Sequence, residues 1–381
     1  MKVLFVSSWY PTQNNPNYGI FVKEHAKAIQ TTATEIVVLA VLTERSKSFF
    51  KLITNDYIDE SGIRTVEINI LSRFRDIIHH LVPLQNRIAY HYFRKHILPT
   101  FSPDLVHSNV VFPAGVIGDY IAQKINKPSV ITEHWSKIAG ILKKPYLSYL
   151  VKRTYQKASK ILPVSEYLKT NMKVLMPYLT DEKFLVVPNV VDAKLFTYKE
   201  KEQAETEIRF CAIATWATKN EPDKYPELFI EAISKVQSSV EKRLKLTIIG
   251  GGDRVEELKK LCVKLDVDAD FVGYQPKAEI ARILQHSHFM IHASRVETFG
   301  VVIVESLMTG TPVLCSNVAA LPELINTSNG ILCENTVESW EIGIMEVLRT
   351  KFNSELIALE VKKKYSLENV GEQITAIYSA N

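Results

Sequence analysis

Residues 292–325 have the sequence HASRVETFGVVIVESLMTGTPVLCSNVAALPELI. Two carboxylates, Glu297 and Glu305, stand on either side of a Phe-Gly pair that opens an apolar helix. Glu305 interrupts a run of Val, Ile, Leu and Met that we expect to be buried, where an ionised carboxylate is costly unless a partner or ligand satisfies it. The helix start near Gly300 offers free N–H groups and the positive end of the helix dipole. The stretch therefore predicts a site for a ligand that carries both phosphates and hydroxyls.

Around this stretch, short apolar strands alternate with amphipathic helices. In the second half we predict strands at 208–214, 244–250, 288–293 and 312–316, and helices at 226–237, 254–265, 277–285 and 337–350. The first half repeats the scheme, with strands at 2–8, 35–42, 104–108, 128–133, 160–165 and 183–188, and helices at 20–30, 86–98 and 146–158. Such alternation predicts an α/β fold of two Rossmann-like, doubly wound domains.

The length of 381 residues exceeds what one ordinary core supports, so two domains are expected. We predict an N-terminal domain at 1–192, completed by a C-terminal helix at 366–381, and a second domain at 193–365. The charged segment 193–207 has no core pattern and is predicted to be the linker. Ligands of such proteins bind in the interdomain cleft at the carboxyl ends of the strands, so the loops that follow strands should carry the function.

Composition and cysteine spacing favour a cytoplasmic protein. Apolar residues make up 46% and charged residues 23% of the chain, which is the balance of a soluble globular protein. No apolar run reaches the length of a membrane span, and the N-terminus lacks the pattern of a signal peptide. The four cysteines are far apart with no CxxC pair, so we expect reduced thiols and neither a disulfide framework nor a zinc knuckle.

The net charge of +4 is unevenly distributed. Residues 1–190 carry 24 Lys and Arg against 14 Asp and Glu, a charge of +10, and the remainder carries 22 against 28, a charge of −6. The segments 73–99 and 143–160 mix basic and aromatic residues, as do helices that lie on an anionic membrane, although a solvated basic face explains them equally well. Nucleic acid is a poor partner, because the chain is only mildly basic and has no binding motif.

In the first half, two residues stand out at strand ends. Gly19 precedes a helix, where a glycine lets a ligand approach the backbone and leaves helix N–H groups free for phosphate, although a plain turn is the simpler explanation. His134 ends a strand within TEHWS, a position suited to substrate contact, but a purely structural histidine is equally consistent with the sequence.

In the second half, a glycine run and two lysines follow strands. Gly251 lies in GGGD between a strand and a helix, which is similar to a phosphate-approach loop without being GxGxxG or a Walker motif. Lys219 and Lys224 precede a helix and could neutralise a diphosphate, although loop lysines are usually solvated. We assign sugar hydroxyls to Glu297 and a ribose diol to Glu305, with the backbone N–H groups of Phe299 and Gly300 facing phosphate.

These residues resemble the signature of retaining glycosyltransferases of the GT-B fold, in the large family 4 (glycosyl transferases group 1). The E-x-F-G-x-x-x-x-E motif matches from Glu297 to Glu305, and GTPV (310–313) and LPELI (321–325) follow at the family's spacing. The segment VVPNVVDAKLF (186–196) is similar to the family's interdomain segment, and the opening SSWYP…NYGIFVKEHA also fits. The resemblance covers nearly the whole chain and is strongest over 183–196 and 244–333.

The resemblance implies roles for individual residues. Glu297 would contact the donor sugar, Glu305 the ribose, Gly19 the donor phosphates, His134 the reacting sugar and Lys224 the diphosphate. The sequence departs from the family pattern at three positions. The family's usual Arg before this lysine is absent, with Lys219 as a candidate substitute; Val190 stands where Gly is common; and an Ala stands where Gly often precedes the last glutamate.

The resemblance therefore implies a retaining, metal-independent transfer of a sugar from a UDP- or GDP-sugar to a glycan or lipid-linked acceptor, as in cell-surface polysaccharide biosynthesis. Front-face attack is favoured, because no carboxylate stands out as a nucleophile. No cofactor beyond the donor is expected, and the protein would be cytoplasmic or peripheral on the inner face of the membrane. A phosphorylase or nucleotide-sugar epimerase and a non-catalytic GT-B subunit stay open, whereas a solute-binding protein is disfavoured by the absent signal peptide.

Overall fold

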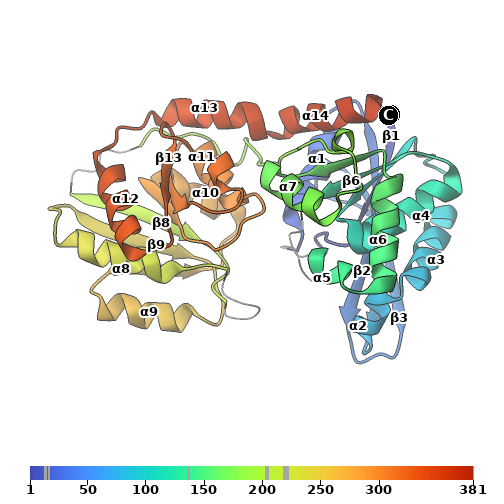
Figure 1. The fold of residues 1–381 in the computed structure, drawn as a ribbon, viewed down its shortest axis with the longest axis horizontal. Coiled ribbons are helices and arrows are strands. Elements are labelled where there is room, and N and C mark those ends of the chain that lie inside the picture. Colours follow the sequence, from blue (N-terminus) through green and yellow to red (C-terminus); the bar gives the residue numbers. More distant parts are fainter. Residues whose placement is uncertain (13–14, 16–17, 135–137, 202–205, 218–222, 381) are drawn as a thin grey trace. The chain divides into compact units, whose positions relative to one another are not determined.

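The computed structural model describes residues 1–381 except 13–14, 16–17, 135–137, 202–205, 218–222 and 381 (Figure 1). The chain forms two compact units, unit 1 at residues 1–190 with 367–381 and unit 2 at residues 191–366. It leaves unit 1 two residues before the boundary expected from the sequence and returns between Ser366 and Leu367. Each unit is an α/β domain built on a largely parallel sheet, as predicted.

Unit 1 contains a seven-stranded sheet in the order β3-β4-β2-β1-β5-β6-β7, parallel except for β3, which runs antiparallel to β4 at one edge. Its strands are β1 (Lys2–Ser7), β2 (Glu35–Arg45), β3 (Lys51–Ile58), β4 (Arg64–Ser72), β5 (Leu105–Asn109), β6 (Ser129–Glu133) and β7 (Lys160–Pro163). Its α-helices are α1 (Ile20–Gln30), α2 (Arg75–His80), α3 (Val82–Tyr92), α4 (Val116–Ile125), α5 (Ile138–Leu142), α6 (Pro145–Lys157), α7 (Glu166–Leu175) and α14 (Leu367–Ser379). The order reverses between β1 and β5.

The central strands of unit 1 are buried on both faces because helices cover both. The side chains of β1 alternate between two core clusters, Val3 and Phe5 in one and Leu4 and Val6 in the other. The first cluster includes α1 and the C-terminal helix α14, whereas the second includes α3 and α4. The continuous β-branched and aromatic run of β1 is the pattern of such a doubly covered parallel strand.

Unit 2 contains a six-stranded parallel sheet in the order β10-β9-β8-β11-β12-β13. Its strands are β8 (Glu207–Ile213), β9 (Arg243–Ile249), β10 (Asp268–Gly273), β11 (Phe289–His292), β12 (Val313–Ser316) and β13 (Gly330–Cys333). Its α-helices are α8 (Pro226–Gln237), α9 (Val255–Lys264), α10 (Lys277–His286), α11 (Val301–Met308), α12 (Val337–Arg349) and α13 (Ser354–Tyr365). The chain runs outward from β8 to β10 and then outward from β11 to β13, so the loops after β8 and β11 diverge at the centre of the sheet.

Some local predictions were wrong. Residues 183–188 form no strand; they run beside β7 with hydrogen bonds from Leu185 N to Ile161 O and from Val187 N to Pro163 O. The helix predicted at 86–98 starts earlier, at Val82, and its last turn is a π-helix at Phe93–Ile97. The β3–β4 hairpin was missed, because β3 is a largely exposed edge strand without an apolar run.

The charged segment 193–207 is not a free linker but part of unit 2. The side chain of Lys201 donates to Leu284 O, Gln285 O and Thr311 Oγ1, and so fixes the segment to the end of α10. Burial lowers the pKa of Lys201 to about 8. A charged sequence concealed this packing, because the lysine satisfies backbone carbonyls rather than an acid.

All four cysteines are buried and unpaired. Over the part of the chain that the structure describes, none of the helices has the length and hydropathy that a membrane crossing requires.

Candidate functional site

The predicted donor residues of unit 2 gather at the carboxyl edge of the sheet, where the strand order reverses. Lys224, in the loop after β8, forms an isolated β-bridge with Ser294, in the loop after β11. Arg295 N also donates to Asp223 O at 2.9 Å, so the two loops are joined beside the strand ends. Open α/β sheets bind ligands at this kind of reversal. Lys219 lies outside the described residues.

Glu297 is the centre of this edge. One carboxylate oxygen, Oε1, accepts hydrogen bonds from the Nζ of Lys224 and from the Nε2 of His292, the latter at 2.9 Å. Lys224 Nζ also lies 3.3 Å from the hydroxyl of Ser294. His292 is the last residue of β11, so a rigid strand end positions it. Both contacts fall on the same oxygen of the carboxylate.

The charges of this cluster are strongly coupled. Burial alone would raise the pKa of Glu297, but the charge of Lys224, and then the hydrogen bond from His292, outweigh it and lower the pKa to about 2. Burial lowers the pKa of His292, and the nearby Lys224 lowers it further. At neutral pH the carboxylate is therefore ionised and the imidazole neutral, with its Nε2 hydrogen directed at Glu297.

Glu305 lies in the fifth position of α11 and is 3% exposed. Its Oε1 is 3.0 Å from the Nζ of Lys277, the first residue of α10. The sequence implies an energetic cost of burying this carboxylate. A cation from a neighbouring helix meets part of that cost. Lys277 is 30% exposed, so the pair lies at the rim of the site rather than deep in the core.

The Phe299–Gly300 pair shapes the start of α11. The ring of Phe299 is buried and lies 5.8 Å from that of Tyr365, so only its backbone can face a ligand. Gly300 has φ +96°, and a Cβ there would lie 2.9 Å from Leu321 Cδ2, so a side chain would be strained. α11 has no side-chain N-cap and no acid in its first turn, which leaves its N-terminus suited to an anion.

The glycine loop after β9 has a structural explanation. A Cβ on Gly251 would lie 2.6 Å from the ring of Tyr274, and Gly251 O accepts hydrogen bonds from Trp216 N and from the hydroxyl of Tyr274. The neighbouring Gly250 and Gly252 have φ of +110° and +148°, and a Cβ on them would lie within 2 Å of the backbone oxygens of Ala214 and Trp216, so the loop needs glycine at these two positions. Its contact with a donor stays a prediction.

In unit 1, Gly19 and His134 lie on loops at the same edge of the sheet. Gly19 has φ +70°, and a Cβ there would lie 2.4 Å from the backbone of Trp9, so the start of α1 requires glycine. His134 is 6% exposed; its Nε2 lies 3.0 Å from Asn109 Oδ1, and its Nδ1 has no hydrogen-bond partner among the described residues. Burial, and then His25, lower the pKa of His134 well below its usual value, so this imidazole is neutral.

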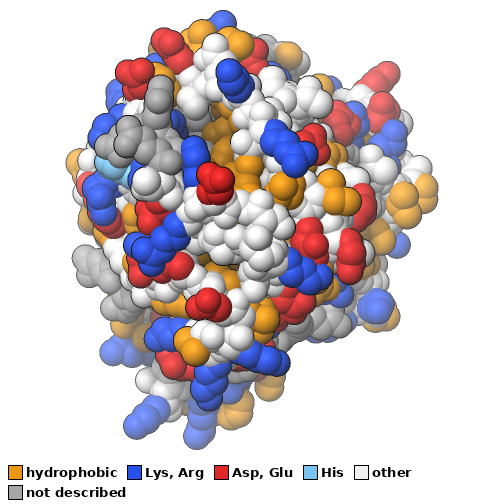
Figure 2. Space-filling view, turned by 90° about the vertical axis from the view of Figure 1, so that its left-hand side faces the viewer, with side chains coloured by type: hydrophobic (Ala, Val, Ile, Leu, Met, Phe, Trp, Pro, Cys, Tyr) orange, Lys and Arg blue, Asp and Glu red, His pale blue; other side chains and the backbone are white. Residues whose placement is uncertain are grey.

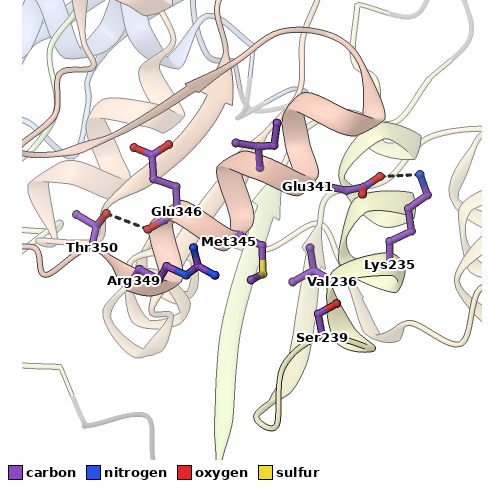
Figure 3. A pocket seen from close by; sticks show the side chains of 9 residues that line it. Lys235, Val236, Ser239, Glu341, Met345, Glu346, Arg349 and Thr350 are labelled. Atoms are coloured by element: carbon purple, nitrogen blue, oxygen red, sulfur yellow. Dashed lines mark hydrogen bonds and ion pairs between the residues drawn. The ribbon is translucent and has the colours of Figure 1, made fainter.

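Two hollows differ in their relation to these loops. A pocket of about 390 Å³ in unit 1 is lined by the loop after β1, the end of β2, α2 and Phe112, and includes Trp9, Tyr18, Glu44 and Arg75. A groove of about 560 Å³ in unit 2 lies between α8 and α12 (Figure 3). The groove is formed by the end of α8 and the middle and end of α12, and the ends of these helices lie toward the amino edge of the sheet, so it is not part of the candidate site.

Sequence reasoning missed His292 and Lys277. Both were visible only as an isolated histidine at the end of a strand and an isolated lysine at the start of a helix. Neither pattern distinguishes a site residue from a surface residue until the loops are brought together. Among the described residues no group of three His, Cys, Asp or Glu side chains could hold a metal ion.

The comparisons with known proteins agree with this geometry. The sequence matches the family Glycosyltransferase Family 4 over residues 25–195 and the family Glycosyl transferases group 1 over residues 212–361. The chain belongs to the family 4 glycosyltransferases of the GT-B fold. This glycosyltransferase is 26% identical over 348 residues to an uncharacterized glycosyltransferase of Methanocaldococcus jannaschii, covering 88% of this chain and 92% of that protein.

Further relatives extend over nearly the whole chain. Alpha-monoglucosyldiacylglycerol synthase of Streptococcus pneumoniae is 24% identical over 387 residues, covering 94% of this chain and 85% of that protein. Sucrose-phosphate synthase from Thermosynechococcus elongatus has a TM-score of 0.72 at 13% identity, covering 100% of this chain and 98% of that one. HepE of Anabaena in complex with UDP has a TM-score of 0.72 at 17% identity, covering 100% of both chains. At these identities the two structures establish the fold.

Proposed function

We propose that this glycosyltransferase moves a sugar from a UDP- or GDP-sugar to a glycan or lipid-linked acceptor, with retention at the anomeric carbon. The observation that carries the proposal is the cluster at Glu297, where one carboxylate is held ionised by a lysine and a histidine at the point of strand reversal. The ammonium of Lys224 can bind a diphosphate, and the carboxylate of Glu297 can accept hydrogen bonds from sugar hydroxyls. The two groups are in direct contact. The solved complex of HepE with UDP-glucose supports a nucleotide-sugar donor.

Donor binding would rearrange the cluster. Lys224 pairs with Glu297, and the diphosphate would compete for this lysine. Glu297 would still keep its hydrogen bond from His292 and so remain ionised and oriented. Lys224 then stabilises the charge that develops on the leaving diphosphate, which counts most in the transition state.

The remaining donor contacts follow from the elements around α11. The N-terminus of α11 at Gly300 would receive a phosphate, and Glu305, steadied by Lys277, would accept hydrogen bonds from the ribose diol. In unit 1, the start of α1 at Gly19 would lie by the donor phosphates and His134 by the reacting sugar. The similarity of the sequence to the family, rather than the exposure of His134, which is 6%, supports this placement.

The transfer would follow front-face attack. The acceptor oxygen forms a bond to the anomeric carbon on the face from which the diphosphate leaves, the bond from that carbon to the diphosphate oxygen breaks, and the diphosphate takes the acceptor proton. We further propose that no metal is needed, because Lys224 and helix N–H groups can meet the charge of the leaving group.

The pocket of unit 1 is the proposed acceptor site. Trp9 and Phe112 offer aromatic surface, and Glu44, Tyr18 and Arg75 offer hydrogen-bonding groups, a combination suited to a sugar. The name of the Streptococcus pneumoniae relative supports an acceptor attached to lipid. We therefore place the reaction in cell-surface glycan synthesis, in the cytoplasm or at the inner face of the membrane.

A thermal-protection screen tests the donor assignment. We expect UDP or GDP to raise the melting temperature of the wild type and of Glu297→Gln alike, and the attached sugar to add protection only in the wild type. Glu341→Gln, which changes a surface carboxylate on α12, is the matched control and should behave as wild type. If no nucleoside diphosphate protects the wild type, the donor site is wrong. If Glu297→Gln keeps the added protection, the role of Glu297 is wrong.

A further inference from the structure

One end of unit 1 exposes apolar side chains that its core does not use. The turn between β2 and β3 presents Phe49, which is 66% exposed, and α2 with the residues around it presents Phe74, Ile77 and Leu81, which are 42%, 60% and 45% exposed. Figure 1 shows β3 and α2 together at this end of the unit. In α2 only Ile78 is buried, so the inward face of the helix is already packed without these residues.

Two of the exposed rings and an arginine are in contact. The rings of Phe49 and Phe74 lie 5.4 Å apart, and the guanidinium of Arg73 lies 5.2 Å from the first ring and 5.1 Å from the second. Arg73 N donates to Ser48 O at 2.8 Å, which fixes the turn against the start of α2. Ile77 follows Phe74 by three residues, so the two side chains lie on one side of the helix. We call this group, Phe49, Arg73, Phe74, Ile77 and Leu81, the apolar end patch.

Basic side chains surround the apolar end patch. Segments 45–53 and 73–87 contain six Lys and Arg residues and one acid, Asp76. Asp76 is already paired with Arg45 and Arg75. α6 continues the basic and aromatic surface, because Lys144, next to its first residue, lies 2.9 Å from the Nε2 of His80 at the end of α2.

The tyrosines of α6 extend the same surface. Tyr146 and Tyr149 are exposed, as is the neighbouring Lys143. In contrast, the side of the molecule seen in Figure 2 shows acidic and basic side chains intermixed around small hydrophobic areas. This end of unit 1 therefore differs from the face in Figure 2 in combining net positive charge with exposed rings.

We propose that the apolar end patch docks the protein on an anionic lipid bilayer. The rings and aliphatic chains would enter the headgroup boundary, where aromatic side chains are favoured, and the surrounding Lys and Arg would be attracted by lipid phosphates. Arg73 suits both environments, because its guanidinium covers the two rings while it can still bind a phosphate. The inference deepens the proposed membrane location by assigning the surface that makes it, and it rests on that location but not on the donor site.

Vesicle co-sedimentation of the full chain tests the inference. We expect binding to vesicles of phosphatidylcholine with phosphatidylglycerol, weaker binding to pure phosphatidylcholine, and release by salt. Lys47→Gln with Arg73→Gln should weaken binding about 25-fold, since each basic residue near the surface contributes about a fivefold effect. Phe49→Ser with Ile77→Ser should weaken binding at every salt concentration. Val263→Ser with Ile342→Ser, which removes equally exposed apolar groups from unit 2, is the control and should bind as wild type.

Other outcomes would overturn the inference. These are equal binding of the wild type to both kinds of vesicle, no binding to either, or unchanged binding of the two patch variants. A patch that instead contacts a second copy would give concentration-dependent dimers in sedimentation, lost in Phe49→Ser with Ile77→Ser, without vesicle binding. Protection of each variant by the nucleotide is measured in parallel; it should be unchanged, which shows folding and separates a failure here from a failure of the donor site.

Discussion

Replacing Lys224 by Met should cost unit 2 a measurable part of its stability. Glu297 and Lys224 have side chains that are 18% and 22% exposed, so solvent screens their pairing only weakly. The pKa of Glu297 is about 2, against an ordinary value of 4.5, and Lys224 is the largest cause of the lowering. At about 1.4 kcal/mol for each pKa unit, the shift corresponds to about 3 kcal/mol. We expect Lys224→Met to lose about 2 to 3 kcal/mol at neutral pH, because a buried carboxylate is left with His292 alone.

Urea unfolding of the full chain, monitored by hydrogen exchange in the core strands of unit 2, measures this loss of stability. Lys235→Met is the matched control, because it breaks an ion pair of the same type, with Glu341, on the exposed surface that Figure 3 shows. We expect little change there. Adding Glu297→Gln to Lys224→Met should recover part of the stability, since no unpaired charge then remains. Equal effects of Lys224→Met and Lys235→Met, or no recovery in the double variant, would refute the coupling.

Three further outcomes follow from the same structure. His292→Leu should raise the KM for the nucleotide sugar about tenfold or more, since it removes a hydrogen bond to a charged group, but leave inhibition by the nucleoside diphosphate unchanged. His292→Gln should bring the KM part of the way back to the wild-type value. An equal rise of the KM in both variants would contradict the positioning role. Gly300→Ala should lower the melting temperature through a cost of about 1 to 2 kcal/mol at its left-handed φ, whereas Gly140→Ala, with open space at its Cβ, should not. Acidification should destabilise unit 1 between pH 6.5 and about 4 because burial lowers the pKa of four of its histidines, so the unfolded chain binds more protons there. Denaturant midpoints that stay constant over this range would contradict it. These histidines are His25 and His79, each with a pKa lowered to about 4, His107, with a pKa lowered to about 3, and His134, with a pKa lowered well below its usual value.

The strands and helices that could be predicted are those with a strong local period. α8 spans Pro226–Gln237, the predicted range, because its apolar residues recur at helical spacing after a proline start. The exposed edge strand β3 was missed and 183–188 was assigned wrongly to a strand, because pairing with a neighbour decides strand formation and an apolar run does not.

In the site, too, some features could be predicted from the local sequence and others could not. Glu297, Phe299, Gly300 and Glu305 stand in one short motif, so their types and spacing were visible along the chain. Their partners were not. His292 ends the strand that precedes the loop of Glu297, yet only the geometry directs its Nε2 at the carboxylate. Lys224 reaches Glu297 from a loop more than seventy residues away.

The sequence by itself determined that two α/β domains form and that residues 292–325 carry the two candidate carboxylates, because periodicity and an acid within an apolar run are local properties. Only the tertiary structure decided which cations pair with those carboxylates, since Lys224 and Lys277 come from other loops and helices. It also decided that apolar residues of α2 and the β2–β3 turn remain outside the core, because which side of a helix is covered depends on what packs against it.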